Sequence, residues 1–293
     1  MDEPLRIDVG GAVLVADHRP GPGPLVVLLH AGVCDRRSWR AVTDRLPGVA
    51  TLAHDRRGFG GSTPAGEGDP THLQDLRAVL DHVQGAAAGE PVVLVGSSMG
   101  GGLALDAALE LPERVAALLL LAPAVSGAPA PAAADLDERT LALDAAADEA
   151  LARGDVEEAL EPCLQLWLDG PASPGRVGGA VRELARDSAR AALRGGGADT
   201  GAGEVDAWSR LGELAVPVTV ATGDLDVPYL LRRTEELLER VPGARRAALP
   251  GTAHLPQLEA PDLVADLVVR LLADVAAVGA ADGAVWPRER AQT

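Results

Sequence analysis

The chain has 293 residues, of which 47% are hydrophobic and 24% are charged. That is enough apolar material for a large core, and α/β folds of this length often form one domain with an insertion. The formal net charge is −17, which makes nucleic acids and anionic membrane surfaces poor partners and favours solubility. The sequence contains no lysine, so any mechanism that needs a lysine side chain is excluded.

The sequence shows no targeting or metal-binding signal. Residues Met1–Arg6 lack the basic and then apolar pattern of a secretion signal, and no apolar run is as long as a membrane span. The two cysteines, Cys34 and Cys163, are far apart in sequence and outside metal-ligand spacing. We therefore expect a cytoplasmic bacterial protein with reduced thiols, no metal and no cofactor. The sequence makes no prediction of its oligomeric state.

The first part of the chain predicts a hairpin followed by alternating strands and helices. Short alternating runs between Leu5 and Asp17, around two glycines, indicate an edge hairpin. Continuous apolar runs, typical of parallel strands buried on both faces, follow at 25–30, 49–54, 92–95 and 115–122. Helices are expected at about 36–46, at 71–84 and from residue 103. This alternation predicts a doubly wound, mostly parallel α/β sheet.

Between about Val125 and Arg210 the pattern becomes helical. Apolar side chains recur there at helical spacing, at Leu136, Leu141, Leu143, Leu151, Val156, Leu160, Leu164 and Trp167. We interpret 125–210 as a helical lid inserted into a core formed by 1–124 and 211–278, with Trp167 as a packing residue. Glycines at 195–197 and 201–203 predict the return linker. The core then resumes with strands at 216–221 and 244–249 and helices at about 229–241 and 261–276, and 279–293 form a tail.

The stretch from Val92 to Leu109 carries the strongest chemical signal. Its apolar run ends in Gly96-Ser97-Ser98-Met99-Gly100 and passes directly into a helix-forming segment. A Gly-x-Ser-x-Gly turn between strand and helix presents the central hydroxyl on a strained corner beside a helix N-terminus. The two glycines are expected because side chains there would collide where strand and helix approach. Ser98 is therefore the predicted nucleophile.

A serine nucleophile needs a base, and the base needs an orienting carboxylate. His254 is the only histidine after position 82, and it follows the last predicted strand. His72 and His82 are expected on a helix facing water, His18 in an early turn, and His30 and His54 in structural roles. Asp226 and Asp224 both follow the strand at 216–221. Asp226 is preferred because it lies deeper in its turn, just before Pro228, and Asp224 remains the alternative.

The order Ser98, Asp226, His254 is the chain order of the α/β-hydrolase triad, and five stretches resemble that superfamily. They are His30-Ala31-Gly32, residues 55–62 (Asp-Arg-Arg-Gly-Phe-Gly-Gly-Ser), residues 96–100, Gly223-Asp224-Leu225-Asp226 and Ala253-His254-Leu255-Pro256. The resemblance covers residues 25 to 275, and Ala31 where glycine is commoner is a mild departure. It implies oxyanion donors at the backbone N–H groups of Gly32, or of Val33, and of Met99. The loop at 55–62 is expected to be structural and held by an arginine–carboxylate pair.

We therefore predict a serine hydrolase that cleaves a carboxylic ester or lactone of a small to medium apolar acyl group through an acyl-enzyme on Ser98. The chain resembles carboxylesterases and enol-lactone hydrolases. Dehalogenases and epoxide hydrolases are disfavoured because their nucleophile is an aspartate. The alternatives are a cofactor-free haloperoxidase or an acyltransferase of the same fold, or a non-catalytic ligand-binding member.

Overall fold

The computed structural model describes residues 3–64, 66, 68, 70–84, 90–195 and 205–281. Its centre is an eight-stranded sheet with the strand order β1-β2-β4-β3-β5-β6-β7-β8. The strands are β1 (Leu5–Asp8), β2 (Val13–Arg19), β3 (Val26–Leu29), β4 (Thr51–His54), β5 (Val92–Ser97), β6 (Val115–Leu121), β7 (Val218–Gly223) and β8 (Arg245–Leu249). The pairs β1/β2 and β2/β4 are antiparallel, and every other pair is parallel. The predicted doubly wound, mostly parallel sheet is confirmed.

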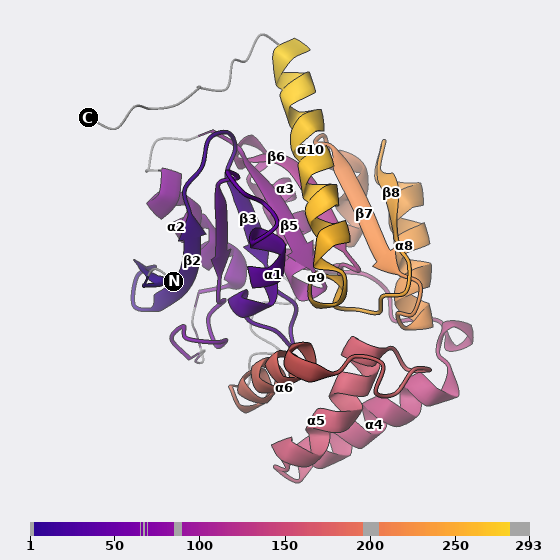
Figure 1. Cartoon of the computed structure of the whole chain (residues 1–293). Coiled ribbons are helices and arrows are strands. Elements are labelled where there is room, and N and C mark those ends of the chain that lie inside the picture. The colour runs from indigo at the N-terminus through magenta and orange to yellow at the C-terminus, as the bar shows by residue number, and fades with distance from the viewer. Residues whose placement is uncertain are drawn as a thin grey trace.

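Helices cover both faces of this sheet (Figure 1). Those of the core are η1 (Arg36–Trp39), α1 (Arg40–Thr43), α2 (His72–Gln84), α3 (Met99–Glu110), η2 (Pro112–Arg114), α8 (Pro228–Arg240), α9 (Pro256–Glu259) and α10 (Pro261–Ala281). Alternate strand residues point to opposite faces. Val27 and Leu29 belong to the apolar cluster that also contains residues of α2, α3 and α8, whereas Val26 and Leu28 belong to the cluster that contains residues of α1 and α10. The central strands are therefore buried on both faces, which explains their continuous apolar sequences.

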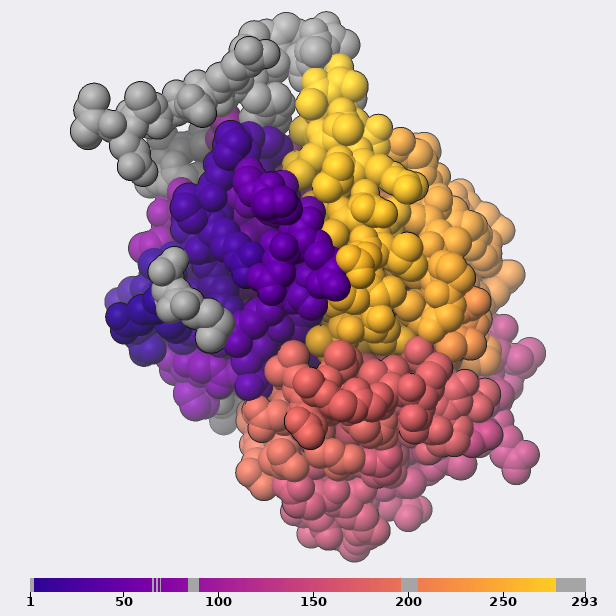
Figure 2. All heavy atoms as spheres, viewed as in Figure 1, coloured from indigo at the N-terminus to yellow at the C-terminus, as the bar shows by residue number. Residues whose placement is uncertain are grey.

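The described residues between β6 and β7 form helices joined by loops, and they contain no strand. It contains η3 (Ala133–Asp135), α4 (Glu138–Ala152), α5 (Val156–Leu164), the π-helix η4 (Gln165–Asp169), α6 (Gly179–Arg194), α7 (Ala207–Arg210) and η5 (Leu211–Glu213). In Figures 1 and 2, α4, α5 and α6 lie together against one end of the core. A small apolar cluster joins the two parts, with Leu164 and Leu168 packed near Ala31 and Leu255.

Several local expectations differ from the structure. His72 is buried, 8% exposed, because the first turn of α2 lies near Phe59, whose ring centroid is 6.3 Å away. His18 lies on β2 instead of in a turn. Leu141, expected in the apolar stripe, is 48% exposed. Helix α10 runs to Ala281, past the expected start of the tail at residue 279, while 196–204 of the linker and 282–293 of the tail lie outside the described residues.

Within the described ranges, no helix has the length and apolar character that crossing a bilayer requires.

Candidate active site

Ser98 occupies a strained corner between β5 and α3. Its φ is 53° and its ψ is −117°, a backbone conformation that costs a residue with a Cβ of order 1–3 kcal/mol. Three backbone hydrogen bonds hold it: its N–H donates to Leu121 O over 2.9 Å, and its carbonyl accepts from Gly102 and Ala124 over 3.0 Å each. The corner is thus fixed by the neighbouring strand β6 and by the first turn of α3.

The two glycines of the motif are required by this close approach. A Cβ on Gly96 would lie 2.3 Å from Gly100 O, and one on Gly100 would lie 2.1 Å from Leu29 O. Both contacts are with backbone, which cannot rotate away as a flexible side chain can. The steric reason predicted for these glycines is confirmed.

Gly32 and Met99 lie next to each other beside Ser98. The position that a Cβ on Gly32 would take is only 2.5 Å from Met99 Sδ. Among the described residues, the N–H groups of Gly32 and Met99 have no hydrogen-bond partner, and neither has that of Val33. Unused backbone N–H groups from two different loops can serve as the donors of an oxyanion hole.

Asp226 and His254 meet at the carboxyl end of the sheet. Asp226 Oδ2 lies 2.9 Å from His254 Nδ1, and Asp226 Oδ1 accepts from Val227 N over 2.8 Å. Both side chains are almost fully buried. Next to an ionised carboxylate, Nδ1 carries the proton and Nε2 is left as an acceptor. This is the tautomer that a general base needs.

Asp224, the alternative acid, has a different contact. Its Oδ1 accepts from Gly251 N over 2.7 Å, at an exposed position. Leu225 N also donates to Thr252 O over 3.0 Å. These two bonds join the loop after β7 to the loop after β8, so Asp224 holds the loops together while Asp226 contacts the imidazole.

The predicted site residues follow strands β3, β5, β7 and β8, and therefore lie at one edge of the sheet, where open α/β sheets bind their ligands. Within the described residues, Asp226 is hydrogen-bonded to His254, and Gly32 lies beside Met99. No hydrogen bond joins Ser98 Oγ to the His254 ring in this described part. The contact between nucleophile and base stays a prediction.

Three other histidines near the site are neutral. Burial lowers the pKa of His54 to about 4 and that of His72 to about 3, and it lowers the pKa of His30 well below its usual range. His30 also has both ring nitrogens in contacts, since Nδ1 lies 2.8 Å from Ala31 O and Nε2 accepts from Arg56 N over 3.1 Å. These rings serve packing, as expected for His30 and His54.

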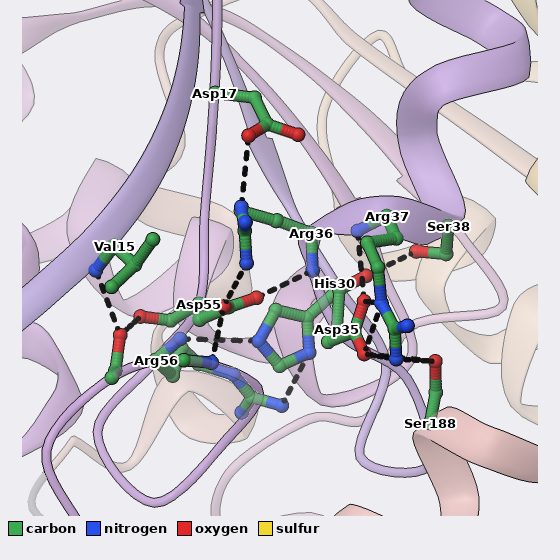
Figure 3. A network of polar contacts seen from close by, with 12 residues as sticks. Val15, Asp17, His30, Asp35, Arg36, Arg37, Ser38, Asp55, Arg56 and Ser188 are labelled. Carbon is green, nitrogen blue, oxygen red and sulfur yellow. Dashed lines mark hydrogen bonds and ion pairs between the residues drawn. The ribbon is translucent and has the colours of Figure 1, made fainter. Parts of the chain in front are cut away.

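The loop at residues 55–62 is held by two ion pairs, which confirms that expectation. Asp55 accepts from the N–H groups of Arg36 and Gly61 and pairs with the Arg36 guanidinium (Figure 3). Arg57 makes a two-pronged pair with Asp75, at 2.9 and 2.8 Å. Both carboxylates are buried, so the two ion pairs anchor the loop to Arg36 on one side and to α2 on the other.

Two contacts from the segment between β6 and β7 reach the histidine loop, and the sequence did not indicate either. The ring centroid of Trp167 lies 4.8 Å from that of His254, so this residue packs on the predicted base itself. Arg176 pairs with Glu259, whose carboxylate also accepts from the N–H groups of Ala253 and Leu255. No pattern around Glu259 in the sequence indicates these contacts.

Comparison with known proteins gives consistent results. Residues 26–267 match the Alpha/beta hydrolase family. The chain is 27% identical to a 2-succinyl-6-hydroxy-2,4-cyclohexadiene-1-carboxylate synthase named as putative in Bacillus subtilis, over 92% of this chain and 98% of that protein. It is 29% identical to a pimeloyl-[acyl-carrier protein] methyl ester esterase of Neisseria meningitidis, over 80% and 87%. A thermophilic esterase from Thermogutta terrifontis shares the fold, with a TM-score of 0.71, 24% identity and coverage of 94% and 99%.

Proposed function

Because the chain belongs to the alpha/beta hydrolase family, we propose that it is a serine hydrolase that cleaves a carboxylic ester or lactone through an acyl-enzyme on Ser98. The observation that carries the proposal is the 2.9 Å hydrogen bond between Asp226 and His254, at the edge of the sheet where Ser98 stands on its strained corner. The methyl ester esterase of Neisseria meningitidis, 29% identical over most of its length, supports an ester substrate.

The mechanism follows from the placement of these groups. Nε2 of His254 takes the proton of Ser98 Oγ as that oxygen attacks the acyl carbonyl. Asp226, bonded to Nδ1, stabilises the imidazolium that forms. The alcohol, or the ring oxygen of a lactone, leaves with that proton. Water then attacks the acyl-enzyme, again with His254 as base, and releases the acid.

The tetrahedral oxygen receives hydrogen bonds from the N–H groups of Gly32 and Met99. Each such donor lowers the barrier by about 3 kcal/mol, because it is already oriented before charge develops. The two N–H groups have no other partner in the described structure. They therefore break no protein hydrogen bond when they bind the substrate.

We assign residues 125–210 the role of a lid over this edge. The contacts of Trp167 with His254 and of Arg176 with Glu259 support this role. Ser188 of α6 also donates to buried Asp35, in the loop after β3, over 2.9 Å. The apolar cluster of Leu164, Leu168 and Leu255 at the same boundary suits an acyl group with an apolar stem.

The test compares wild type with Ser98→Ala and the neighbouring Ser97→Ala on p-nitrophenyl acetate and a serine-trapping fluorophosphonate. Ser98→Ala should lose at least about 1,000-fold in kcat and form no adduct by mass spectrometry, with unchanged circular dichroism. Ser97 is buried in β5, with an Oγ that lacks a partner in the described structure, so Ser97→Ala should keep both activities. Retention of hydrolysis by Ser98→Ala would refute the assignment of Ser98 as the nucleophile. Absence of turnover and adduct in the wild type would instead favour a ligand-binding protein.

A further inference from the structure

Arg56 is a buried cation beside the candidate active site. It follows β4 and Asp55, and only 2% of its surface is exposed. Burial lowers the pKa of its guanidinium to about 10, so the group is charged at neutral pH. A buried charge of this kind costs several kcal/mol unless a partner compensates it.

The charge of the adjacent Arg57 is compensated by a buried carboxylate. Arg57 is equally buried, at 2% exposed, and forms its two-pronged pair with buried Asp75. Among the described residues, no carboxylate pairs with Arg56 and no group forms a hydrogen bond with its Nε. Two arginines next to each other in sequence, in the same loop, therefore differ in this one respect.

The only polar contact of the Arg56 side chain in the described structure is not a true hydrogen bond. Its Nη2 lies 3.5 Å from Nδ1 of His30 (Figure 3). Nε2 of that ring accepts from the backbone N–H of Arg56, and Nδ1 lies 2.8 Å from the carbonyl of Ala31. The neutral ring therefore carries its proton on Nδ1. Because both groups of the 3.5 Å contact are then donors, the five N–H groups of the guanidinium have no acceptor among the residues that the structure describes.

Phe59 gives Arg56 partial compensation. The guanidinium carbon lies 4.5 Å from the centre of the Phe59 ring. A cation–π contact is worth up to about 2 kcal/mol when desolvated, which is less than the cost of burying an ion. The ring thus offsets part of the cost of burying the charge, and no carboxylate of the described residues offsets the rest.

A cavity lies in contact with this arginine. It has a volume of about 150 Å³, and its walls include Arg56, Met99, and Gly102 and Leu103 from the first turns of α3. A cavity of about that size holds a six-carbon ring. Met99 links it to the reacting centre, since its N–H is the proposed oxyanion donor. The positive end of the α3 dipole adds to the attraction for an anion.

A second polar pair, Asp106 and Ser126, lines the same cavity. Ser126 Oγ donates to Asp106 over 2.6 Å, and burial raises the pKa of Asp106 to about 6. Asp106 makes no ion pair with Arg56 in the described structure. The cavity therefore has one cation without a carboxylate partner among the described residues and one carboxylate, mostly ionised at neutral pH, that already accepts from a hydroxyl.

We propose that Arg56 binds a carboxylate of the substrate, so that the ester cleaved at Ser98 carries a second, free carboxylate on a short acyl chain. A guanidinium edge offers two parallel N–H groups that match a carboxylate. This inference rests on the proposed function for the position of the scissile bond. It adds a charged end to the apolar acyl group that composition alone suggested.

The test uses two esters of equal length, monomethyl glutarate and methyl pentanoate, with methanol release as the readout. Wild type should prefer monomethyl glutarate at least 10-fold in kcat/KM. Arg56→Met should lower that value on the order of 100-fold and leave methyl pentanoate within about threefold. Arg245→Met, at an exposed ion pair with Asp274, removes the same charge elsewhere and should change neither. Equal rates on both esters, or an equal loss on both in Arg56→Met, would overturn the assignment.

A binding arm separates this inference from the proposed function. In Ser98→Ala protein, glutarate should raise the melting temperature more than neutral 1,5-pentanediol does. The added substitution Arg56→Met should abolish that difference, and in the absence of ligand it should not lower the melting temperature. If neither ester is hydrolysed but the glutarate shift depends on Arg56, the hydrolase proposal fails and the carboxylate site stands. If both esters are hydrolysed and glutarate gives no Arg56-dependent shift, the carboxylate site fails alone.

Discussion

Arg176 of the segment between α5 and α6 forms an ion pair with Glu259, whose carboxylate also binds the two backbone N–H groups on either side of His254. The same arginine donates to the carbonyl of Gly251 over 2.9 Å. The loop that carries the proposed base is therefore held by the Glu259 carboxylate, at the end of the following helix α9, and by the Arg176 guanidinium from the proposed lid. Glu259 and Arg176 are positioning residues in this arrangement.

Glu259→Gln should lower kcat by roughly 10- to 100-fold, with a much smaller change in KM. Glutamine has nearly the same shape but has only one acceptor oxygen for the two N–H groups, so the loop shifts, and displacements of about 1 Å are costly in catalysis. Steady-state kinetics on p-nitrophenyl acetate measures kcat and KM separately. Arg153→Met, which removes an exposed ion pair of α4, is the matched control for Arg176→Met. Wild-type kcat in both Glu259→Gln and Arg176→Met would show that the loop does not need this support.

Asp226→Asn should reduce kcat about 10,000-fold, because the amide no longer selects the tautomer with a free Nε2. Asp224→Asn is the control. Its amide oxygen can still accept from Gly251 N, so kcat should stay within about threefold. Both variants are compared by kcat and by urea unfolding. A larger loss in Asp224→Asn than in Asp226→Asn would reverse the assignment of the acid.

Gly100→Ala should destabilise the fold by about 3 kcal/mol, at the upper end of the overpacking range. The new Cβ would meet Leu29 O at 2.1 Å, and the better helix propensity of alanine recovers only about 1 kcal/mol. At Gly212 a Cβ would meet nothing within 4 Å, so Gly212→Ala should be neutral or slightly stabilising. Urea denaturation of the three proteins measures the difference. Similar unfolding midpoints for Gly100→Ala and wild type would contradict the steric argument.

The buried His54 should make the protein less stable as the pH falls. Burial lowers the pKa of His54 to about 4 in the folded chain, against about 6.5 for an exposed histidine. Between these values the unfolded chain binds a proton that the folded chain does not. The free energy of unfolding therefore falls by up to about 1.4 kcal/mol per pH unit as the pH drops from about 6.5 towards about 4.

Replacement of His54 by leucine removes this contribution. Between pH 6.5 and pH 5, the free energy of unfolding of His54→Leu should fall by about 1.6 kcal/mol less than that of the wild type. His82→Gln, at an exposed position on α2, should keep the wild-type slope. Urea unfolding at both pH values measures the free energy of unfolding. An equal pH dependence of that free energy in all three proteins would show that His54 does not titrate between pH 6.5 and pH 5.

The local pattern of the chain was sufficient to predict the sheet, its helices and the serine turn. Continuous apolar strands alternate with amphipathic helices because the sheet is buried on both faces, and this periodicity is present in the residues themselves. Gly96 was predictable for a similar reason, since its Cβ would meet Gly100 O only four residues away, whereas the contact that constrains Gly100 is with Leu29 O on a neighbouring strand. The carboxyl-end rule then placed Gly32, Asp226 and His254 at one edge.

Only the tertiary structure decided the contacts between segments that are far apart in the chain. The hydrogen bond of Asp226, and not Asp224, to His254 depends on how two loops meet. The positions of Trp167 and Arg176 on the histidine loop depend on where the helical segment docks, and His72 is buried because α2 begins near Phe59. The ion pairs of the two arginines also depend on tertiary structure. Arg57 pairs with Asp75, and Arg56 pairs with no carboxylate among the described residues, although Arg56 and Arg57 are adjacent in the sequence. Side-chain partnership is set by distances in space, and composition and spacing do not contain those distances.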